Sequence, residues 1–145
     1  MIDVAKDGDV FVLTMNAGEN RFNRGFVDAF NAALDEVEAY EGTAARVTAG
    51  GAEKFYSNGL DLGWMMGDGA EQAAGMVSDV IRLLGRLLAF PVPSVAAING
   101  HVFAGGAMLA MAHDFRVMRI DRGYFCLPEV DLGLPLADGM AAVLK

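Results

Sequence analysis

The segment from Ser94 to Ala112 has the sequence SVAAINGHVFAGGAMLAMA, and it does most to decide the fold. Its first five residues, Ser94–Ile98, predict a buried strand, and Asn99-Gly100 predicts the turn that follows. A helix is expected over 105–112, and its first-turn N–H groups and dipole could hold an oxygen anion. Alternatively, Gly105 and Gly106 let this helix pack closely against a neighbour, and the spacing alone favours neither interpretation.

Upstream of this segment, strand and helix patterns alternate. Two alternating apolar runs around Asp7-Gly8 predict a hairpin over residues 2–15, because glycine tolerates the positive φ of a tight turn. Apolar residues recur at helical spacing from Asn23 to Tyr40, and Gly42 follows where a helix would stop. A short buried strand is expected over residues 44–49.

The rest of the chain continues the alternation. A loop begins at Gly50-Gly51 and leads to a second long helix over about 71–90, which Pro91 and Pro93 end. The remaining predicted elements are strands at 115–118 and 124–127 and a last helix over about 137–145. This order predicts an α/β architecture with layered sheets, in one domain that spans residues 1–145.

Composition limits the possible classes of function. Of the 145 residues, 54% are apolar and 21% are charged, which excludes a disordered chain. The net charge of −8 opposes binding to nucleic acid or anionic lipid, so we expect no nucleic-acid or membrane partner. Cys126 is the only cysteine and cannot form an internal disulfide. Since no signal sequence or membrane span is evident, we expect a soluble, cytoplasmic protein.

The segment KFYSNGLDL at residues 54–62 is a second candidate for chemistry. Gly59, which follows Ser57 and Asn58, permits a conformation that presents the backbone N–H of Leu60. Asp61 can cap the helix that follows. Alone, this pattern favours an ordinary turn from loop to helix, because glycine and aspartate are common there.

The third candidate is LPEVDLGL at residues 127–134. Glu129 lies among leucine and valine residues, so its carboxyl group would be partly removed from water. Such burial raises the pKa of a carboxyl group toward the range that suits a proton shuttle. A surface glutamate with a solvated side chain is the alternative, and this segment alone favours it.

Together, the three segments resemble the crotonase superfamily, whose members act on acyl-CoA thioesters. The resemblance covers essentially the whole chain and rests on the order and spacing of SNGLDL at 57–62, AAING at 96–100 followed by AGG at 104–106, and PEVDLG at 128–133. The first and last of these, with His113-Asp114, are similar to enoyl-CoA delta isomerases of the plant and peroxisomal type. The resemblance implies a crotonase-like spiral of ββα turns, with the C-terminal helical part missing from this chain.

The resemblance also implies a catalytic site. The backbone amides of Leu60 and Gly105 would form an oxyanion hole for the thioester carbonyl, and Glu129 would carry the proton. Hydratases of the family have another glutamate where this chain has Met108, and a thioether can neither activate water nor donate a proton. The resemblance therefore favours an isomerase that moves a β,γ double bond to the α,β position.

Further site residues and partners follow from the same resemblance. The expected substrate-binding residues are Ser57, Asn58, Gly59, Asp61, Trp64, Gly106 and Met108. Coenzyme A is part of the substrate, and no other cofactor is expected.

His101 and His113 are interpreted as structural, since no ligand spacing supports a metal site. Asp131 could be a second acid, although a structural or capping role is favoured. A full-length member would form a homotrimer or a dimer of trimers.

Two alternatives to the isomerase remain. The first is another crotonase-type reaction, such as hydration, thioester hydrolysis or decarboxylation, because one oxyanion hole serves all of them. Met108 argues against ordinary hydration but not against the others. The second alternative is a non-catalytic acyl-CoA-binding module. The intact Leu60-Asp61, Gly105-Gly106 and Glu129 favour retained chemistry.

Overall fold

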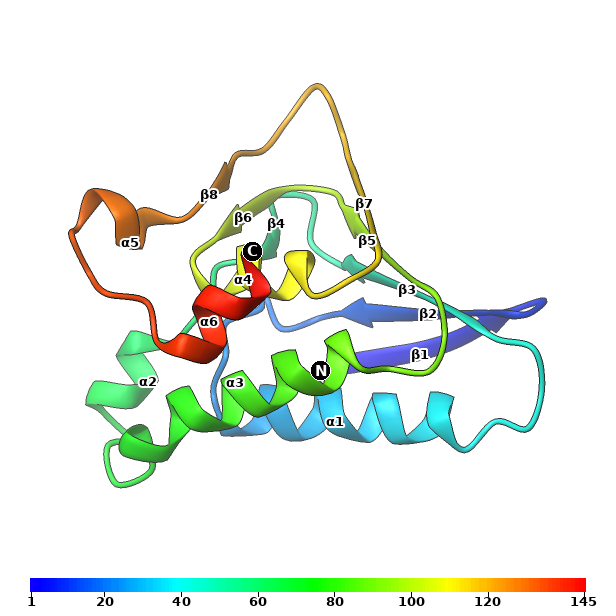
Figure 1. Cartoon of the computed structure of the whole chain (residues 1–145), viewed down its shortest axis with the longest axis horizontal. Helices are drawn as coiled ribbons and strands as arrows, with labels where there is room; N and C mark the ends of the chain where they lie inside the picture. Colours follow the sequence, from blue (N-terminus) through cyan, green and yellow to red (C-terminus); the bar gives the residue numbers. More distant parts are fainter.

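The structure is a computed structural model that describes residues 1–145, in which strands and helices alternate (Figure 1). The strands are β1 (Ile2–Asp7), β2 (Val10–Met15), β3 (Ala45–Gly50), β4 (Phe55–Ser57), β5 (Ser94–Ile98), β6 (His101–Phe103), β7 (Phe115–Met118) and β8 (Phe125–Cys126). The helices are α1 (Arg24–Glu38), α2 (Leu62–Met66), α3 (Ala73–Leu88), α4 (Gly105–Met111), α5 (Pro128–Asp131) and α6 (Asp138–Val143). This α/β content confirms the predicted fold class.

The strands form two sheets that the chain visits in turn. One sheet has five strands in the order β1-β2-β3-β5-β7, and the other has three in the order β4-β6-β8. Only the hairpin of β1 and β2 is antiparallel, and it turns at Gly8 with a φ of +56°, as predicted. After the hairpin, each pair of strands places one strand in each sheet before the next helix. This repeat is the predicted spiral of ββα turns.

The core lies between the five-stranded sheet and the helices that cover it. Helices α1 and α3 run side by side along one face of this sheet (Figure 1). Strand β2 alternates strictly and buries Phe11, Leu13 and Met15 toward them. Helix α4 is buried along residues 105–110, so it runs through the interior and not along the surface.

Three local features differ from the sequence prediction. Strands β4 and β6 lie where a loop and a turn were expected, because three residues are too few to show a strand period. They form through parallel pairing with each other and with β8. Helix α1 ends at Glu38, four residues before Gly42. The segment around Glu129 forms the short helix α5, which was not predicted.

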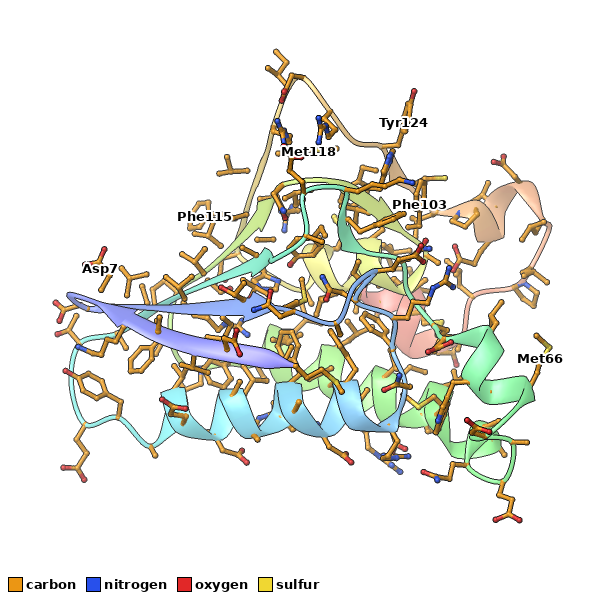
Figure 2. All side chains as sticks on the ribbon, turned by 180° about the vertical axis from the view of Figure 1, so that it is seen from behind. Asp7, Met66, Phe103, Phe115, Met118 and Tyr124 are labelled. Atoms are coloured by element: carbon orange, nitrogen blue, oxygen red, sulfur yellow. The ribbon has the colours of Figure 1, made fainter.

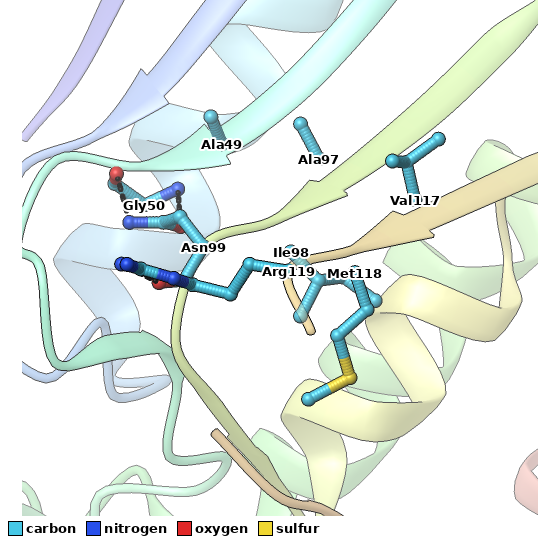
Figure 3. Close-up of a pocket in the computed structure, with 8 residues that line it drawn as sticks. All are labelled: Ala49, Gly50, Ala97, Ile98, Asn99, Val117, Met118 and Arg119. Atoms are coloured by element: carbon cyan, nitrogen blue, oxygen red, sulfur yellow. Dashed lines mark hydrogen bonds between the residues drawn. The ribbon is translucent and has the colours of Figure 1, made fainter. Parts of the chain in front are cut away.

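The opposite side of the five-stranded sheet is more open. Edge strand β7 exposes Phe115, and the following loop exposes Tyr124, as Figure 2 shows. A cavity of about 410 Å³ lies there at the ends of β3, β5 and β7 (Figure 3). Its polar groups are already paired, since Asn99 bonds Gly50 and the Arg119 guanidinium bonds Asp121. No helix in the chain has the length and apolar character needed to cross a bilayer.

Candidate active site

A larger cavity of about 730 Å³ brings together residues from all three predicted segments. Leu60, Gly105 and Glu129 line it, although they are far apart in sequence. Most of the lining is apolar, and the rest of it is Arg21, Asn58, Leu62, Val77, Val80, Phe103, Ala104, Met108, Pro128, Leu132, Leu134, Pro135, Leu136, Ala137 and Met140. The shape and chemistry suit a ligand with a long apolar part and one reactive polar group.

The Leu60 amide is held by its two neighbours. The carbonyl of Gly59 accepts a hydrogen bond from the Phe22 amide at 2.7 Å, and the Asp61 amide donates to the Phe22 carbonyl at 3.0 Å. In an extended backbone, successive peptide groups point in opposite directions. The N–H of Leu60 therefore points away from Phe22, and it donates no hydrogen bond within the chain.

The Gly105 amide is the first of helix α4. The preceding residue, Ala104, has a φ of +52°, which is an unusual backbone conformation for a residue other than glycine. The Ala104 carbonyl accepts from the amides of Ala107 and Met108, whereas the amides of Gly105 and Gly106 have no acceptor in the chain. Of these two glycines only Gly105 lines the cavity, so its amide is the second free N–H group there, after that of Leu60.

The glycines in these two segments permit the close approach of their backbones. A Cβ on Gly106 would lie 2.4 Å from the Ser57 carbonyl oxygen, and one on Gly59 would lie 2.8 Å from the Gly105 nitrogen. The close-packing interpretation of the glycine pair is therefore confirmed. The same contact brings the two free amides together, so packing and anion binding are compatible here.

Glu129 is half-buried on α5, and one of its oxygens, Oε2, is buried with no hydrogen-bond partner. The alternative of a fully solvated surface glutamate does not describe this side chain. Met108, on α4, also lines the cavity and is only 1% exposed. The site therefore offers one carboxylate and a thioether, not two carboxylates.

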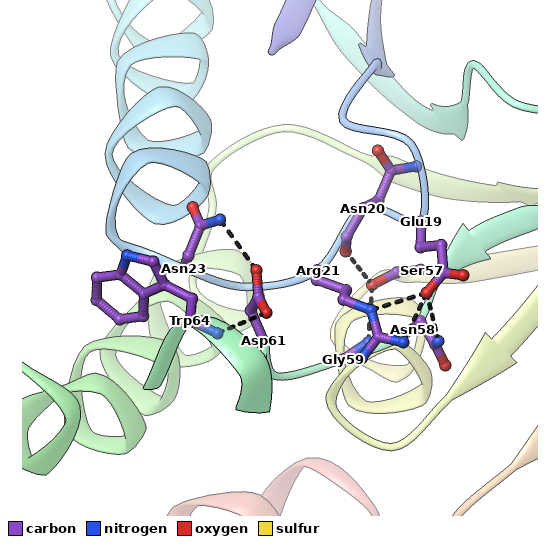
Figure 4. Close-up of polar contacts among 9 residues, drawn as sticks. All are labelled: Glu19, Asn20, Arg21, Asn23, Ser57, Asn58, Gly59, Asp61 and Trp64. Atoms are coloured by element: carbon purple, nitrogen blue, oxygen red, sulfur yellow. Dashed lines mark hydrogen bonds and ion pairs between the residues drawn. The ribbon is translucent and has the colours of Figure 1, made fainter. Parts of the chain in front are cut away.

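The other predicted substrate-binding residues differ in whether they line the cavity, and Figure 4 shows those of the 57–64 segment. Asn58 lines the cavity and donates to Glu19 at 2.9 Å. Ser57 is buried and serves the backbone, since its hydroxyl donates to the Asn20 carbonyl at 2.8 Å. Asp61 caps α2 by accepting from the Trp64 amide at 3.0 Å, which confirms the predicted cap.

Trp64 lies outside the cavity lining, and so do Ser57, Gly59, Asp61 and Gly106. The indole ring of Trp64 instead covers Gly69, where a Cβ would lie 2.2 Å from the ring. The expectation that Trp64 binds the substrate therefore finds no support in its position. The polar residues around Gly59 act on the backbone that presents the Leu60 amide.

Several lining residues were missed by sequence reasoning. Val77 and Val80 lie in the helix predicted over about 71–90, and the periodic pattern of a helix does not distinguish a cavity wall from a core contact. No motif or periodic pattern in the sequence indicated that Arg21 would line the site. In the structure its guanidinium pairs with Glu19 at 2.6 Å at one edge of the cavity. The hydrogen bond from Asn58, and after it the pairing with Arg21, hold the Glu19 pKa below its usual range.

The two histidines lie outside this cavity. In His113, Nδ1 contacts the Leu109 carbonyl and Nε2 contacts the Thr48 hydroxyl, both at 2.9 Å. Burial lowers its pKa to about 3, so the ring is neutral near pH 7. The ring of His101 stacks on Phe103 and Tyr124. No cluster of three or more His, Cys, Asp or Glu side chains is placed to hold a metal ion.

Two free backbone amides beside one carboxylate in an apolar cavity suit an enzyme that stabilises an oxyanion while a proton moves. Comparison with known proteins identifies the family to which the chain belongs. The enoyl-CoA hydratase/isomerase family model matches residues 5–145, and the chain belongs to this family.

Individual relatives agree with this assignment. Enoyl-CoA delta isomerase 3 from Arabidopsis thaliana is 36% identical over 148 residues, which cover 99% of this chain and 62% of the relative. The peroxisomal enoyl-CoA delta isomerase 2 of the same plant is also 36% identical, and 63% of it is covered. The crystal structure of an enoyl-CoA hydratase/isomerase family protein from Pseudomonas syringae superposes with a TM-score of 0.83 at 31% identity, covering 98% of this chain and 60% of that one. The chain thus spans between 60% and 63% of the length of these three proteins.

Proposed function

We propose that this chain carries the catalytic site of an enoyl-CoA isomerase, which converts a β,γ-enoyl-CoA into its α,β isomer. The observation that carries the proposal is that one cavity contains Glu129 as its carboxylate and Met108 where a hydratase would have a second glutamate. A single carboxylate is enough to take a proton from one carbon and return it to another. Addition of water calls for a second acid–base group, and a thioether cannot supply it.

The proposed reaction begins at the α-carbon of the substrate. Glu129 removes a proton there, and the electrons of the C–H bond move toward the thioester carbonyl, whose oxygen becomes an enolate. The amides of Leu60 and Gly105 donate to this oxygen. The protonated Glu129 then returns its proton to the γ-carbon as the electrons move back, and the double bond reforms between the α- and β-carbons. Atoms and charge balance, because the same proton leaves and returns.

The position of Glu129 supports its role as the base. Its buried Oε2 has no hydrogen-bond partner, so no protein donor competes for the lone pairs that must accept the proton. The surrounding wall is mostly apolar, with Leu132, Leu134 and Leu136 from the segment that follows α5. Such a wall would hold an acyl chain and keep water from the enolate.

The resemblance of the chain to two enoyl-CoA delta isomerases supports the same choice. We propose an acyl-CoA thioester as the substrate, with coenzyme A as part of it and no separate cofactor. The homotrimer or dimer of trimers remains a prediction, as does the cytoplasmic location.

The test is an isomerase assay with a β,γ-enoyl-CoA, followed by the absorbance of the conjugated product. We expect turnover by the wild type, and a fall of at least about a hundredfold in Glu129→Gln, which keeps the shape but cannot accept the proton. Asp131→Asn, which replaces an exposed carboxylate on the same short helix, is the matched control and should retain activity. Hydration of the α,β isomer is measured in parallel.

Two results would count against the proposal. Binding of the thioester without turnover of either isomer would favour a non-catalytic module. Hydration that exceeds isomerisation would favour another reaction of the family.

A further inference from the structure

The N-cap residues of two helices, Asn23 and Asp61, are hydrogen-bonded to each other (Figure 4), and Asp61 directly follows Leu60 in the chain. The Oδ1 atom of Asn23 caps α1 by accepting from the Phe26 amide at 3.0 Å, and the Oδ1 atom of Asp61 caps α2 by accepting from the Trp64 amide at 3.0 Å. The remaining polar atoms of the two side chains bond each other, since Asn23 Nδ2 donates to Asp61 Oδ2 at 3.3 Å. Each side chain therefore serves its own helix and also the other cap.

The backbone is bridged at the same place. Phe22, the residue before Asn23, forms backbone hydrogen bonds with Gly59 and Asp61, which are the residues on either side of Leu60. The side-chain bond and the two backbone bonds together tie the 22–23 segment to the 59–61 segment. This arrangement fixes the plane of the peptide that carries the Leu60 N–H.

The two helices joined in this way differ in how firmly they are held. Helix α1 has 15 residues and buries six of them in the core. Helix α2 has five residues and none of them is fully buried. A helix this short has little stability of its own, so its start is expected to move unless another element holds it. The bond from Asn23 links it to the stable helix.

We infer that Asn23 and Asp61 are a coupled pair of positioning residues, which set the direction of the Leu60 amide through their mutual hydrogen bond. The inference rests on the proposed function, in which that amide stabilises the enolate. Neither residue touches the substrate, since neither lines the cavity. Their effect reaches the reaction only through the backbone of residues 59–61.

The test removes the mutual bond and keeps both caps. Serine is a good N-cap residue, so Asn23→Ser and Asp61→Ser each retain a capping oxygen and lose the bond between the caps. Loss of an oxyanion donor costs about a hundred- to a thousandfold in rate, and a misdirected donor should cost less, about tenfold in kcat. KM should change little, because the amide acts mainly on the transition state.

An exchange of the two residues provides the rescue. Asn23→Asp combined with Asp61→Asn leaves a capping oxygen at each position and restores the hydrogen bond in the opposite direction. We expect this double variant to recover most of the wild-type kcat. The combination of both serine variants should be no worse than either alone, because the same bond is lost in each.

A second measurement does not depend on activity. The Asp61 amide bonds the Phe22 carbonyl, so its hydrogen exchange reports whether the 59–61 segment is held. Exchange of this amide should be about tenfold faster in each serine variant and return toward the wild-type rate in the exchanged pair, at temperatures where all variants are folded.

The outcomes separate this inference from the proposed function. Wild-type kcat in the serine variants, additive losses, or no rescue by the exchanged pair would each overturn the inference. Absence of isomerase turnover in the wild type would count against the proposed function alone. In that case, unchanged exchange of the Asp61 amide in the serine variants would still overturn the coupling, and faster exchange with rescue would support it.

Discussion

Gly59 packs against the amide of Gly105 so closely that the two residues leave no room for a side chain between them. A Cβ on Gly59 would lie 2.8 Å from the Gly105 nitrogen and 3.0 Å from the Ala104 Cβ, and Gly59 itself has a φ of +72°. Two segments that are more than forty residues apart thus meet through backbone atoms, at the place where both free amides lie.

This contact predicts a severe effect of Gly59→Ala. The methyl group would be strained by the positive φ and would push the Gly105 amide away, so both stability and isomerase activity should fall. We expect a loss of about 2–4 kcal/mol in the free energy of unfolding, measured by urea denaturation, and at least a tenfold loss in kcat/KM.

Gly8→Ala is the control for Gly59→Ala. Gly8 has a φ of +56° and no atom within 4 Å of its added Cβ, so this variant carries the strain without the clash. It should lose only about 1 kcal/mol and keep its activity. Equal losses in the two variants would show that the contact with Gly105 is unimportant.

Met108→Glu should change the choice of reaction. The new carboxylate would lie in the same cavity as Glu129 and could activate water, so hydration of an α,β-enoyl-CoA should become measurable. Burying the charge should lower the free energy of unfolding by about 2–4 kcal/mol. Met108→Gln has the same shape without acid–base chemistry. If both variants hydrate the substrate equally, a role for the carboxylate is disproved.

His113 should make the protein less stable in acid. Burial lowers its folded pKa to about 3 from an ordinary value of 6.5, so the unfolded chain binds the proton more readily. The contribution to stability is therefore complete above pH 6.5 and is lost as the pH falls toward 3. The slope for this one group is about 1.4 kcal/mol per pH unit.

Unfolding of wild type and His113→Gln by urea between pH 7 and about pH 4 measures this effect. The stability difference between the two proteins should shrink as the solution is acidified, because only the wild type has the buried imidazole. A difference that stays constant over the range would contradict the assignment of a neutral, buried His113.

Arg46 should be replaceable with a gain in stability. The residue is 0% exposed, none of its three side-chain nitrogens has a hydrogen-bond partner in the chain, and burial lowers its pKa to about 10. Its guanidinium group stacks on Phe90 with 4.9 Å to the ring centroid. Arg46→Met keeps this stacking shape without a buried charge and should raise the free energy of unfolding by about 1–4 kcal/mol.

Arg86→Met provides the comparison for Arg46→Met. Arg86 also lies over Phe90, but its guanidinium group bonds Asn31, Asp35 and Glu38. This variant should lose stability by about 1 kcal/mol. A loss in both variants would mean that the cation is required on the Phe90 ring, whatever its partners.

The sequence was a good guide wherever a local pattern was long or specific. Helices α1 and α3 were predicted because fifteen or more residues carry a clear 3.6-residue period. The cap at Asp61 was predicted because aspartate before a helix has a known partner. The three segments were grouped by their resemblance to a family, and the structure places a residue from each in one cavity.

Other features depend on tertiary contacts that no local pattern reveals. Strands β4 and β6 have only three residues each and form through parallel pairing, β4 with β6 and β6 also with β8. Trp64 was predicted to bind substrate, yet its ring packs on Gly69 and it lies outside the cavity lining, because the direction of a side chain three positions after Asp61 depends on tertiary packing. Arg21 and Met140 line the cavity because distant elements fold toward it. The side chain of Asn20, which is buried, donates to the Tyr56 carbonyl 36 residues further along the chain.

Both proposed oxyanion donors are main-chain groups, and this has an evolutionary consequence. Substitution at Leu60 can leave the donor in place, since every amino acid except proline supplies the same N–H group. Selection can therefore reshape the acyl pocket through side chains while the anion-binding backbone is inherited unchanged. Under the proposed mechanism, divergence of reaction type within this architecture would be concentrated at a few positions such as Met108, where one residue would decide whether water is recruited.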